Sequence, residues 1–303
     1  MPASTSIIIV AADSGAGLRE CVARALASSV PVEVVVVDNG SRDGVPQALA
    51  RAHESDGCVR VLYNHANLGF GPAVNAGARA AHGSALLVLN PDCLLEADTV
   101  ARLLDVLRAH PDAGVIGAVV CDTNGTPDPA SRRRDPLLRR SLNEMTGRAK
   151  QPAQGARDEG VYVAGPIPDE VIEVENVSGA LMLLPRAAFD RLHGFDEGYF
   201  LHCEDLDLCR RARDAGYRVL LAGGVSVQHG KGGSSAHRPV FVSYHKHRGM
   251  WRWFRKFDPA ARGLPMGALV ACGIWTHFLL TAPLLALRPR IGRHRGNGVI
   301  HDP

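Results

Sequence analysis

The sequence is short of aromatic residues, of lysines and of closely spaced cysteines. Phe, Trp and Tyr make up only 5% of the 303 residues, and four lysines stand beside 30 arginines, which we interpret as a coding bias. We therefore expect no nucleic-acid partner. Hydrophobic residues make up 46% of the chain, so one large domain or two small ones can have an ample buried core.

The cysteines contain no C-x-x-C pair and are odd in number, which argues against a disulfide-stapled secreted domain. They are Cys21, Cys58, Cys93, Cys121, Cys203, Cys209 and Cys272. We expect a reduced, cytosolic setting. The N-terminus offers only a short apolar run, residues 7–12, behind an uncharged segment, so the sequence predicts a first buried strand there and no secretory signal.

Acidic side chains are nearly absent from the end of the chain. Residues 238–303 hold 11 basic and 2 acidic side chains, a net charge of +9, whereas residues 1–237 hold 23 basic and 29 acidic ones, a net charge of −6. Such a split predicts a tail that meets an anionic partner while the body does separate work. We expect an anionic membrane surface to be that partner.

Residues 264–287 contain no Asp, Glu, Lys or Arg. About 24 residues, at roughly 1.5 Å each, suffice to cross a bilayer core about 30 Å thick. Pro265, Pro283 and His277 argue against a regular span, and the arginines on both sides suit a helix that lies in the membrane interface. A helix buried in the protein's own core or in a homodimer interface is the third interpretation.

Short β-branched runs alternate with amphipathic stretches through the first 120 residues. The strand-like runs cover residues 6–12, 32–37, 59–63, 85–89 and 115–120. Runs that are apolar on both faces and separated by helices predict an α/β fold with a mostly parallel sheet covered on both sides. Ligands of such folds bind beyond the carboxyl ends of the strands, so the loops there are the candidate site.

The regular pattern stops between residues 121 and 175, where Pro, Gly, Arg and Asp predominate and Arg132, Arg133 and Arg134 form a basic cluster. We interpret this segment as a long flexible loop, either a lid or a solvated insertion. Regular structure is expected again as strand 177–184, helix 204–215 ending at Gly216, strand 219–222 and the basic helix 241–257.

The second strand ends on Asp38, and a polar turn with Asn39, Ser41 and Asp43 follows. A carboxylate at a strand's exit can accept hydrogen bonds from a pyrimidine base or a ribose. The alternative is an Asx turn with no ligand. A second alternative is a nicotinamide-dependent oxidoreductase, because Gly15 and Gly17 follow the first strand about twenty residues before Asp38, although Glu20 stands where a third glycine is needed.

A glycine-rich segment with Asn67 and Gly69 leads into a helix of small residues that carries Asn75. It predicts close approach of the backbone to a ligand and a polar contact from Asn75. The alternative is tight packing of the helix on the sheet.

The fourth apolar run ends at Asn90-Pro91-Asp92, a D-x-D spacing with Asn in the first position. Oxygen ligands of this kind, together with phosphate oxygens, suit Mg²⁺ on a nucleoside diphosphate. His229, at the end of a later strand-like run, is a candidate to complete the metal shell. A simple helix cap at Asp92 is the alternative.

Several acids begin the helix near residue 204: Glu204, Asp205 and Asp207. Some of them compensate the helix dipole. A carboxylate beside a diphosphate is also what deprotonation of a sugar hydroxyl requires.

The order and spacing of these motifs over about residues 5–257 resemble family 2 glycosyltransferases of the GT-A fold, in particular bacterial dTDP-L-rhamnose transferases of O-antigen and cell-wall synthesis. The resemblance implies that Asp38 holds base and ribose, that Asn90 and Asp92 hold Mg²⁺ or Mn²⁺, and that Asp205, with Glu204 beside it, is the catalytic base. It also implies acceptor contacts from Ser178, Gly179 and Ala180, and a metal-shell role for His229. Asn90 departs from the family's pattern, and the departure should weaken metal binding.

The resemblance implies a single inverting displacement on a lipid-linked or polysaccharide acceptor at the cytoplasmic face of the inner membrane. The expected domains are a GT-A domain over residues 1–237 and C-terminal helices over 238–303. Within the first, residues 1–120 form the nucleotide-binding half, 121–175 the flexible loop and 176–237 the acceptor and catalytic half. A UDP-sugar donor and a noncatalytic, membrane-tethered nucleotide-binding module remain alternatives.

Overall fold

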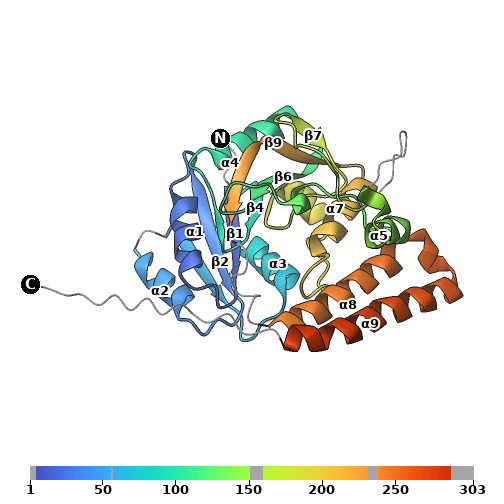
Figure 1. The fold of residues 1–303 in the computed structure, drawn as a ribbon. Helices are drawn as coiled ribbons and strands as arrows, with labels where there is room; N and C mark the ends of the chain where they lie inside the picture. The colour runs from blue at the N-terminus through green and yellow to red at the C-terminus, as the bar shows by residue number, and fades with distance from the viewer. Residues whose placement is uncertain (1–4, 56, 151–159, 231–237, 288–303) are drawn as a thin grey trace, which may run out of the picture.

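The computed structural model describes residues 5–55, 57–150, 160–230 and 238–287. They form a nine-stranded mixed sheet with helices on both faces and a pair of C-terminal helices beside it (Figure 1). The strands are β1 (Thr5–Ala11), β2 (Val32–Asp38), β3 (Val59–Tyr63), β4 (Ala85–Leu89), β5 (Cys93–Leu94), β6 (Ala113–Cys121), β7 (Val171–Glu173), β8 (Leu181–Pro185) and β9 (Arg218–His229). The α-helices are α1 (Ala16–Leu26), α2 (Val45–Ala52), α3 (Phe70–Ala80), α4 (Thr99–Ala109), α5 (Leu138–Met145), α6 (Arg186–Arg191), α7 (Glu204–Asp214), α8 (Pro239–Phe257) and α9 (Leu264–Ala286).

The predicted strands of the first 120 residues are confirmed, and β3, β2, β1 and β4 lie side by side in parallel. The order along the sheet is β3-β2-β1-β4-β8-β6-β9-β5, and β7 pairs with β9. The second half is mixed, because β8 runs antiparallel to both β4 and β6, and β5 and β7 run antiparallel to β9. The expectation of a mostly parallel sheet therefore holds for β1, β2, β3 and β4, whereas β8 runs in the opposite direction between β4 and β6.

The two faces of the sheet carry separate cores. Side chains of α1, α2 and α4 pack on one face, with Leu18, Leu49 and Leu103 among the buried residues. Side chains of α3, α6 and α7 pack on the other, with Val74 and Phe189 among them. Because both faces are covered, the central strands are apolar on both sides, as their β-branched runs predict.

The prediction of a loop without regular structure over residues 121–175 is wrong for the residues described. This segment contains the 3₁₀ turns η1 (Pro129–Ser131) and η2 (Arg148–Lys150), helix α5 and strand β7. Ion pairs attach it to the rest of the domain: Arg140 pairs with Glu175 at 2.7 Å, and Asp135 pairs with Arg210 at 3.1 Å. Sequence patterning misses this because buried ion pairs, and no apolar period, hold the segment.

Helices α8 and α9, joined by the 3₁₀ turn η3 (Pro259–Arg262), form an antiparallel hairpin along one side of the α/β domain (Figure 1). Lys256 of α8 donates to Asp196 at 2.8 Å and to Asp207 at 2.6 Å. Trp253 is buried in a small cluster with Tyr199 and Leu206. Helix α8 therefore packs as part of the α/β domain, and α9 lies outside it.

Candidate active site

The carboxyl ends of the parallel strands form one edge of the sheet, and the predicted motifs follow them. Ala11 of β1 lies opposite Asp38 of β2, and Ile9 lies opposite Leu89 of β4. The loops after these three strands therefore begin at neighbouring positions on one edge, where ligands of open α/β sheets bind.

Strands β8 and β9 bring later parts of the chain to the same edge. Leu181, the first residue of β8, lies opposite Leu89, so the preceding turn at 178–180 adjoins the end of β4. At the end of β9, His229 lies opposite Cys93. Residues more than a hundred positions apart in sequence thereby meet at one site.

Asp38 is buried and accepts two hydrogen bonds from its own turn and from α2. Its Oδ1 accepts from the Ser41 N–H at 2.8 Å and its Oδ2 from Gln47 Nε2 at 3.3 Å. The Asx-type turn is thus present. The Oε1 atom of Gln47 is buried and has no hydrogen-bond partner among the described residues. Asp38 and Gln47 together can take a further donor, such as the ring N–H of a base, which makes Gln47 a candidate that the sequence pattern did not indicate.

Ser41 and Asp43 connect the turn after β2 with the loop after β1. Ser41 Oγ accepts from the Asp13 N–H at 3.1 Å, and Asp43 Oδ2 accepts from the Gly15 N–H at 2.8 Å. Both side chains are therefore engaged in holding two site loops together. Gly15 is the N-cap residue of helix α1 in this arrangement.

Asn39 holds the loop after β3 and has no polar atom left over. It donates to Asn67 Oδ1 at 2.9 Å and to the Gly69 carbonyl at 3.0 Å. Its Oδ1 accepts from Asn64 Nδ2 and from the Leu68 N–H, each at 3.0 Å. With two side-chain donors and two lone pairs used, the Asn39 side chain positions loops, and a nucleotide contact from this residue stays a prediction.

Asn75 likewise connects α3 with the loop before α7. It donates to the Phe195 carbonyl at 2.9 Å and to Glu197 Oε1 at 3.0 Å, and it accepts from the Phe195 N–H at 2.8 Å. Gly69, at φ 96°, allows the Phe70 N–H to reach the Phe200 carbonyl at 2.9 Å. These residues, for which the sequence predicts ligand contacts, hold the loop that leads to α7.

The proposed metal ligands come together as expected from the sequence. His229 Nε2 lies 3.0 Å from Asp92 Oδ1 and 3.3 Å from Asn90 Nδ2. Asp92, Cys93 and His229 each offer a ligand atom, and these atoms lie within 4.8 Å of one another. The side chains of His229 and Asp92 are 21% and 23% exposed, so one side of the group stays open to solvent and to phosphate oxygens. A carboxylate and an imidazole suit Mn²⁺ or Mg²⁺, and Asn90 would add its amide oxygen if its side-chain amide were turned over.

Cys93 is the member of this group that the sequence pattern missed. Burial, together with the nearby Asp92 charge, raises the pKa of its thiol well above the ordinary value. The thiol donates to the Ala180 carbonyl at 3.5 Å. A protonated thiol is a poor ligand for a hard cation, so the oxygen and nitrogen donors are the ones that fit.

Asp205, at the start of α7, faces the turn at 178–180 and is paired with Arg133. Its Oδ2 accepts from the Gly179 N–H at 3.0 Å and from the Arg133 guanidinium at 2.5 Å. Burial favours the neutral acid, but the charge and hydrogen bond of Arg133 outweigh it and lower the pKa of Asp205. The carboxylate is thus held ionised, as a proton acceptor must be before it reacts.

Glu204 has the opposite environment from its neighbour. Its Oε2 is buried and has no hydrogen-bond partner among the described residues. Burial and the adjacent charge of Asp205 raise the pKa of Glu204 to about 8. Two adjacent carboxyl groups with their pKa values pushed apart are typical of sites that move a proton.

Arg133 is the residue of this site whose role the sequence did not predict. Its backbone pairs with Asn176, and its guanidinium also donates to the Val177 carbonyl at 3.0 Å. Arg132 and Arg134, its neighbours in the basic cluster, instead donate to carbonyl oxygens of residues 160–166. The cluster was recognisable in the sequence, but only the fold shows which arginine points inward.

Comparison with known proteins identifies what this arrangement belongs to. Residues 6–162 match the family described as Glycosyl transferase family 2. The chain is 32% identical over 251 residues to the N-acetylglucosaminyl-diphospho-decaprenol L-rhamnosyltransferase of Mycobacterium tuberculosis (strain H37Rv), covering 75% of this chain and 79% of that protein. It is 46% identical over 57 residues to the rhamnosyltransferase WbbL of Escherichia coli (strain K12), a match of 18% of this chain and 22% of the relative.

Solved structures share the fold. A mannosyltransferase from Pyrobaculum calidifontis, in complex with GDP-Man and Mn²⁺, superposes with a TM-score of 0.58 at 20% identity, over 93% of this chain and 72% of that one. GalNAc-T7 with UDP, GalNAc and Mn²⁺ gives a TM-score of 0.58 at 16% identity, over 93% and 54% of the two chains. The family match spans Gly15, Gly17 and Asp38, so it replaces the nicotinamide hypothesis.

Proposed function

The chain belongs to glycosyltransferase family 2 and is a glycosyltransferase, and from this premise we propose that it transfers L-rhamnose from dTDP-L-rhamnose to a lipid-linked acceptor. The similarity to a rhamnosyltransferase named for a diphospho-decaprenol substrate, over three quarters of the chain, supports the sugar and the class of acceptor. The observation that carries the chemistry is the Asp205 carboxyl group beside the turn at 178–180, where it accepts from the Gly179 N–H and from Arg133, whose charge lowers its pKa.

The proposed reaction is one inverting displacement. The acceptor sugar lies against Ser178, Gly179 and Ala180, and its hydroxyl gives its proton to Asp205. The oxygen then forms a bond to the anomeric carbon of the donor while the bond from that carbon to the nucleoside diphosphate breaks. The electron pair leaves with the diphosphate, and the configuration of the anomeric carbon inverts. Arg133 keeps Asp205 ionised and oriented until the hydroxyl arrives.

Glu204 is proposed to support this proton transfer from beside Asp205. Its raised pKa keeps it neutral near pH 7, so the pair carries one negative charge and not two. A neutral Glu204 leaves Asp205 as the only charged carboxyl of the pair, which is the state that a single general base needs.

Asp92, Asn90 and His229 would hold a divalent cation, whose charge would stabilise the departing nucleoside diphosphate. The donor set fits such an ion, and Mn²⁺ accompanies GDP-Man in one of the similar structures and UDP with GalNAc in the other. Asn90 supplies no charge, so we expect weaker metal binding than two carboxylates would give.

The donor's base is proposed to contact Asp38 and Gln47. The loops after β1, β2 and β3, held together by Ser41, Asp43, Asn39 and Asn67, form the wall of this part of the site. A UDP-sugar is the alternative donor, since Asp38 can serve either pyrimidine. A lipid-linked acceptor also implies work at a membrane, and we propose the cytoplasmic face, where nucleotide sugars are available.

Calorimetric titration of the purified protein with dTDP and with UDP, each with and without Mn²⁺, tests the donor and metal proposals together. We expect dTDP to bind more tightly with Mn²⁺, Asp92→Ala to remove that difference and Asn90→Asp to enlarge it. Tighter binding of UDP would replace the dTDP-sugar by a UDP-sugar. Equal binding with and without Mn²⁺, together with activity in excess chelator, would contradict the metal site.

A further inference from the structure

Helix α9 is covered along one stripe only. Tyr244 of α8 contacts Trp275 and Phe278 with ring centroids 5.8 Å apart in each case, and His247 Nε2 lies 2.9 Å from His277 Nδ1. No residue of α9 is buried. The interpretation of residues 264–287 as a core helix is therefore wrong, because the described chain covers a single side.

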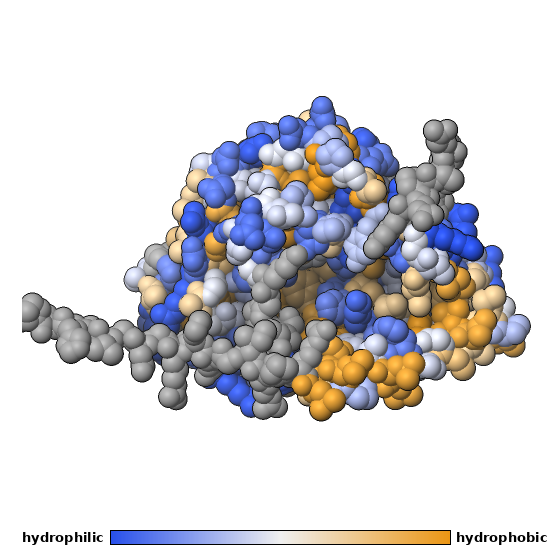
Figure 2. Space-filling view, in the orientation of Figure 1, coloured by the Kyte–Doolittle hydropathy of each residue, from blue (hydrophilic) through white to orange (hydrophobic). Residues whose placement is uncertain are grey.

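The other side of α9 is apolar and open. Leu269, Leu280 and Leu284 are 65%, 69% and 66% exposed, and hydrophobic residues gather along the outer edge that α9 forms (Figure 2). A helix that is apolar on all sides is normally surrounded by protein or by lipid. Within the described residues nothing surrounds this face, so it requires a partner.

A membrane-crossing orientation of α9 conflicts with its packing on α8. The two helices run side by side, and α8 carries exposed Lys246, Arg248 and Arg255 along the same length. If α9 crossed the bilayer, these cations and the part of the domain clamped by Lys256 would lie at the depth of the acyl chains, which is costly for charged groups. The hairpin is compatible with a bilayer only when both helices lie parallel to its surface.

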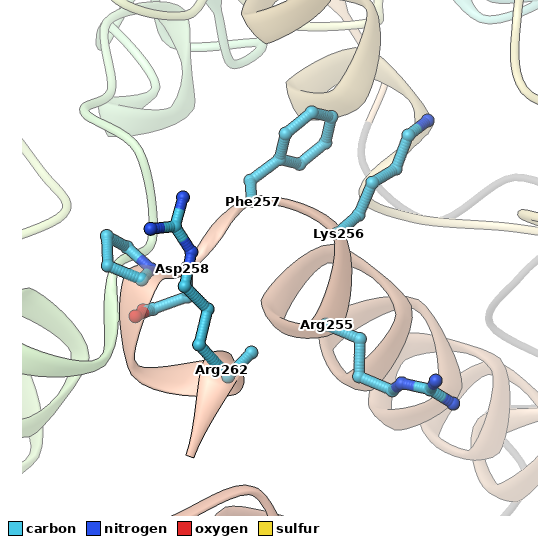
Figure 3. A pocket seen from close by; sticks show the side chains of 7 residues that line it. Arg255, Lys256, Phe257, Asp258 and Arg262 are labelled. Atoms are coloured by element: carbon cyan, nitrogen blue, oxygen red, sulfur yellow. The ribbon is translucent and has the colours of Figure 1, made fainter.

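Cations mark the corner where α8 turns into α9. Arg255 and Arg262 line a hollow of about 140 Å³ there, together with Asp258 (Figure 3). The Asp258 carboxylate is engaged by the N–H groups of Leu138 and Ala260. Among the described residues, no carboxylate lies within ion-pairing distance of either guanidinium, and the Arg255 guanidinium lies over the Trp251 ring, 5.8 Å from its centroid. The Arg255 and Lys256 side chains diverge (Figure 3). Guanidinium groups that have no carboxylate partner among the described residues and lie next to an apolar face suit lipid phosphates, and they would repel a second copy of the same corner.

We propose that the α8–α9 hairpin is an in-plane membrane anchor, with the outer face of α9 among the acyl chains just below the headgroups and with Arg255 and Arg262 on the phosphates of anionic lipids. This placement goes beyond the proposed function, and it shares with it only the membrane setting. It holds Asp205 at a fixed height above the lipid surface, because Lys256 connects α8 to the catalytic helix through Asp207.

Measuring the depth of α9 residues in the bilayer, on the full-length protein, distinguishes an in-plane helix from a membrane-spanning one. All variants carry Cys58→Ser. One is labelled with a fluorophore at native Cys272, and two others carry Cys272→Ser and are labelled at Leu269→Cys or at Leu280→Cys. The fluorescence is quenched by lipids that carry quenchers at different depths. An in-plane helix gives one shallow depth at all three positions. A spanning helix separates residues 269 and 280 by about 16 Å along the membrane normal, and that result would overturn the proposal.

Vesicle binding, measured without any sugar substrate, tests the partner. We expect binding to vesicles of phosphatidylglycerol and phosphatidylcholine, about tenfold weaker for Leu280→Glu and about fivefold weaker per cation for Arg255→Ala and Arg262→Ala. Arg19→Ala, an exposed arginine on α1, is the matched control and should bind normally. Circular dichroism and nucleotide binding report whether each variant is folded. If the protein does not bind vesicles and forms dimers at higher concentration, the outer face of α9 is the contact with a second copy. A failure of sugar transfer alone does not affect the vesicle-binding measurement.

Discussion

At the scale of single residues, Arg133 sets the protonation state of the proposed base. Because Arg133 lowers the pKa of Asp205, its removal should raise that pKa, and the acid limb of the kcat/KM profile should move to higher pH. We expect Arg133→Met to show this shift and Arg133→Lys to restore most of the wild-type profile. Arg134→Met is the control and should leave the profile unchanged, because the Arg134 guanidinium donates to the carbonyl oxygens of Gly160 and Tyr162 and not to Asp205. An unshifted acid limb in Arg133→Met would remove Arg133 from this role.

Glu204 should make stability fall with rising pH. In the folded chain the Glu204 carboxyl group has a pKa of about 8, whereas in the unfolded chain its pKa is near 4.5. The folded state therefore binds more protons between these values, and the free energy of unfolding decreases as pH rises through this window.

Glu204→Gln removes this dependence, so the variant should be more stable than wild type at pH 8.5 by about 1 kcal/mol or more, and the advantage should vanish near pH 4.5. Urea unfolding at several pH values measures it. Glu20→Gln, at an exposed position on α1, is the control. If the difference in the free energy of unfolding between Glu204→Gln and wild type is the same at every pH, folding does not raise the pKa of Glu204.

The sequence predicts the charged members of the site better than their neighbours. Asp38, Asp92 and Asp205 follow abrupt changes from apolar to polar residues, so their places at the sheet edge could be inferred. Asn39 and Asn75 occur in equally suggestive positions, yet their amides are used within the protein. Sequence spacing locates a polar residue along an element, but it does not show how many of its hydrogen bonds the fold already uses.

At the scale of elements, the start of α3 depends on a close backbone contact. A Cβ at Gly69, at φ 96°, would lie 2.7 Å from the Phe200 carbonyl oxygen, which neither backbone can relieve without moving. Gly57 has a φ of 65° with no atom within 4 Å of such a Cβ. Both alanine variants are strained, but only Gly69→Ala also clashes.

We therefore expect Gly69→Ala to lose at least about 1 kcal/mol more than Gly57→Ala in chemical unfolding. It should also lower turnover, because the displaced segment leads directly into α7. Equal losses for the two variants would mean that the contact between Gly69 and Phe200 contributes nothing to stability.

Strands β1, β2, β3, β4 and β6 and helices α7 and α8 could be predicted from periodicity, since each buries a regular apolar face. Strand β7 and helix α5 could not. Helix α5 is short and polar, and it is held by Arg140 on Glu175 and by Asp258, which accepts from the Leu138 N–H at 2.6 Å. Such contacts join distant positions and leave no periodic signal in the local sequence.

At the scale of the whole molecule, catalysis and membrane attachment should be separable. Every residue proposed for chemistry precedes residue 230, and α8 remains clamped to the domain without α9. Deletion of residues 263–303 should therefore release the protein from membranes while transfer to a short soluble acceptor continues. Loss of both properties, with the fold intact by circular dichroism, would show that α9 also contributes to the site.

We propose that this chain is an inverting rhamnosyltransferase with Asp205 as its base. The most direct measurement incubates the purified protein with dTDP-L-rhamnose, Mn²⁺ and a lipid-linked N-acetylglucosamine diphosphate, and determines the product's anomeric configuration by NMR. We predict a rhamnosylated product whose anomeric configuration is opposite to that of the donor, and no product from Asp205→Asn, which still binds dTDP. A product with retained configuration would contradict the inverting reaction, and wild-type turnover by Asp205→Asn would contradict the assignment of Asp205 as the base.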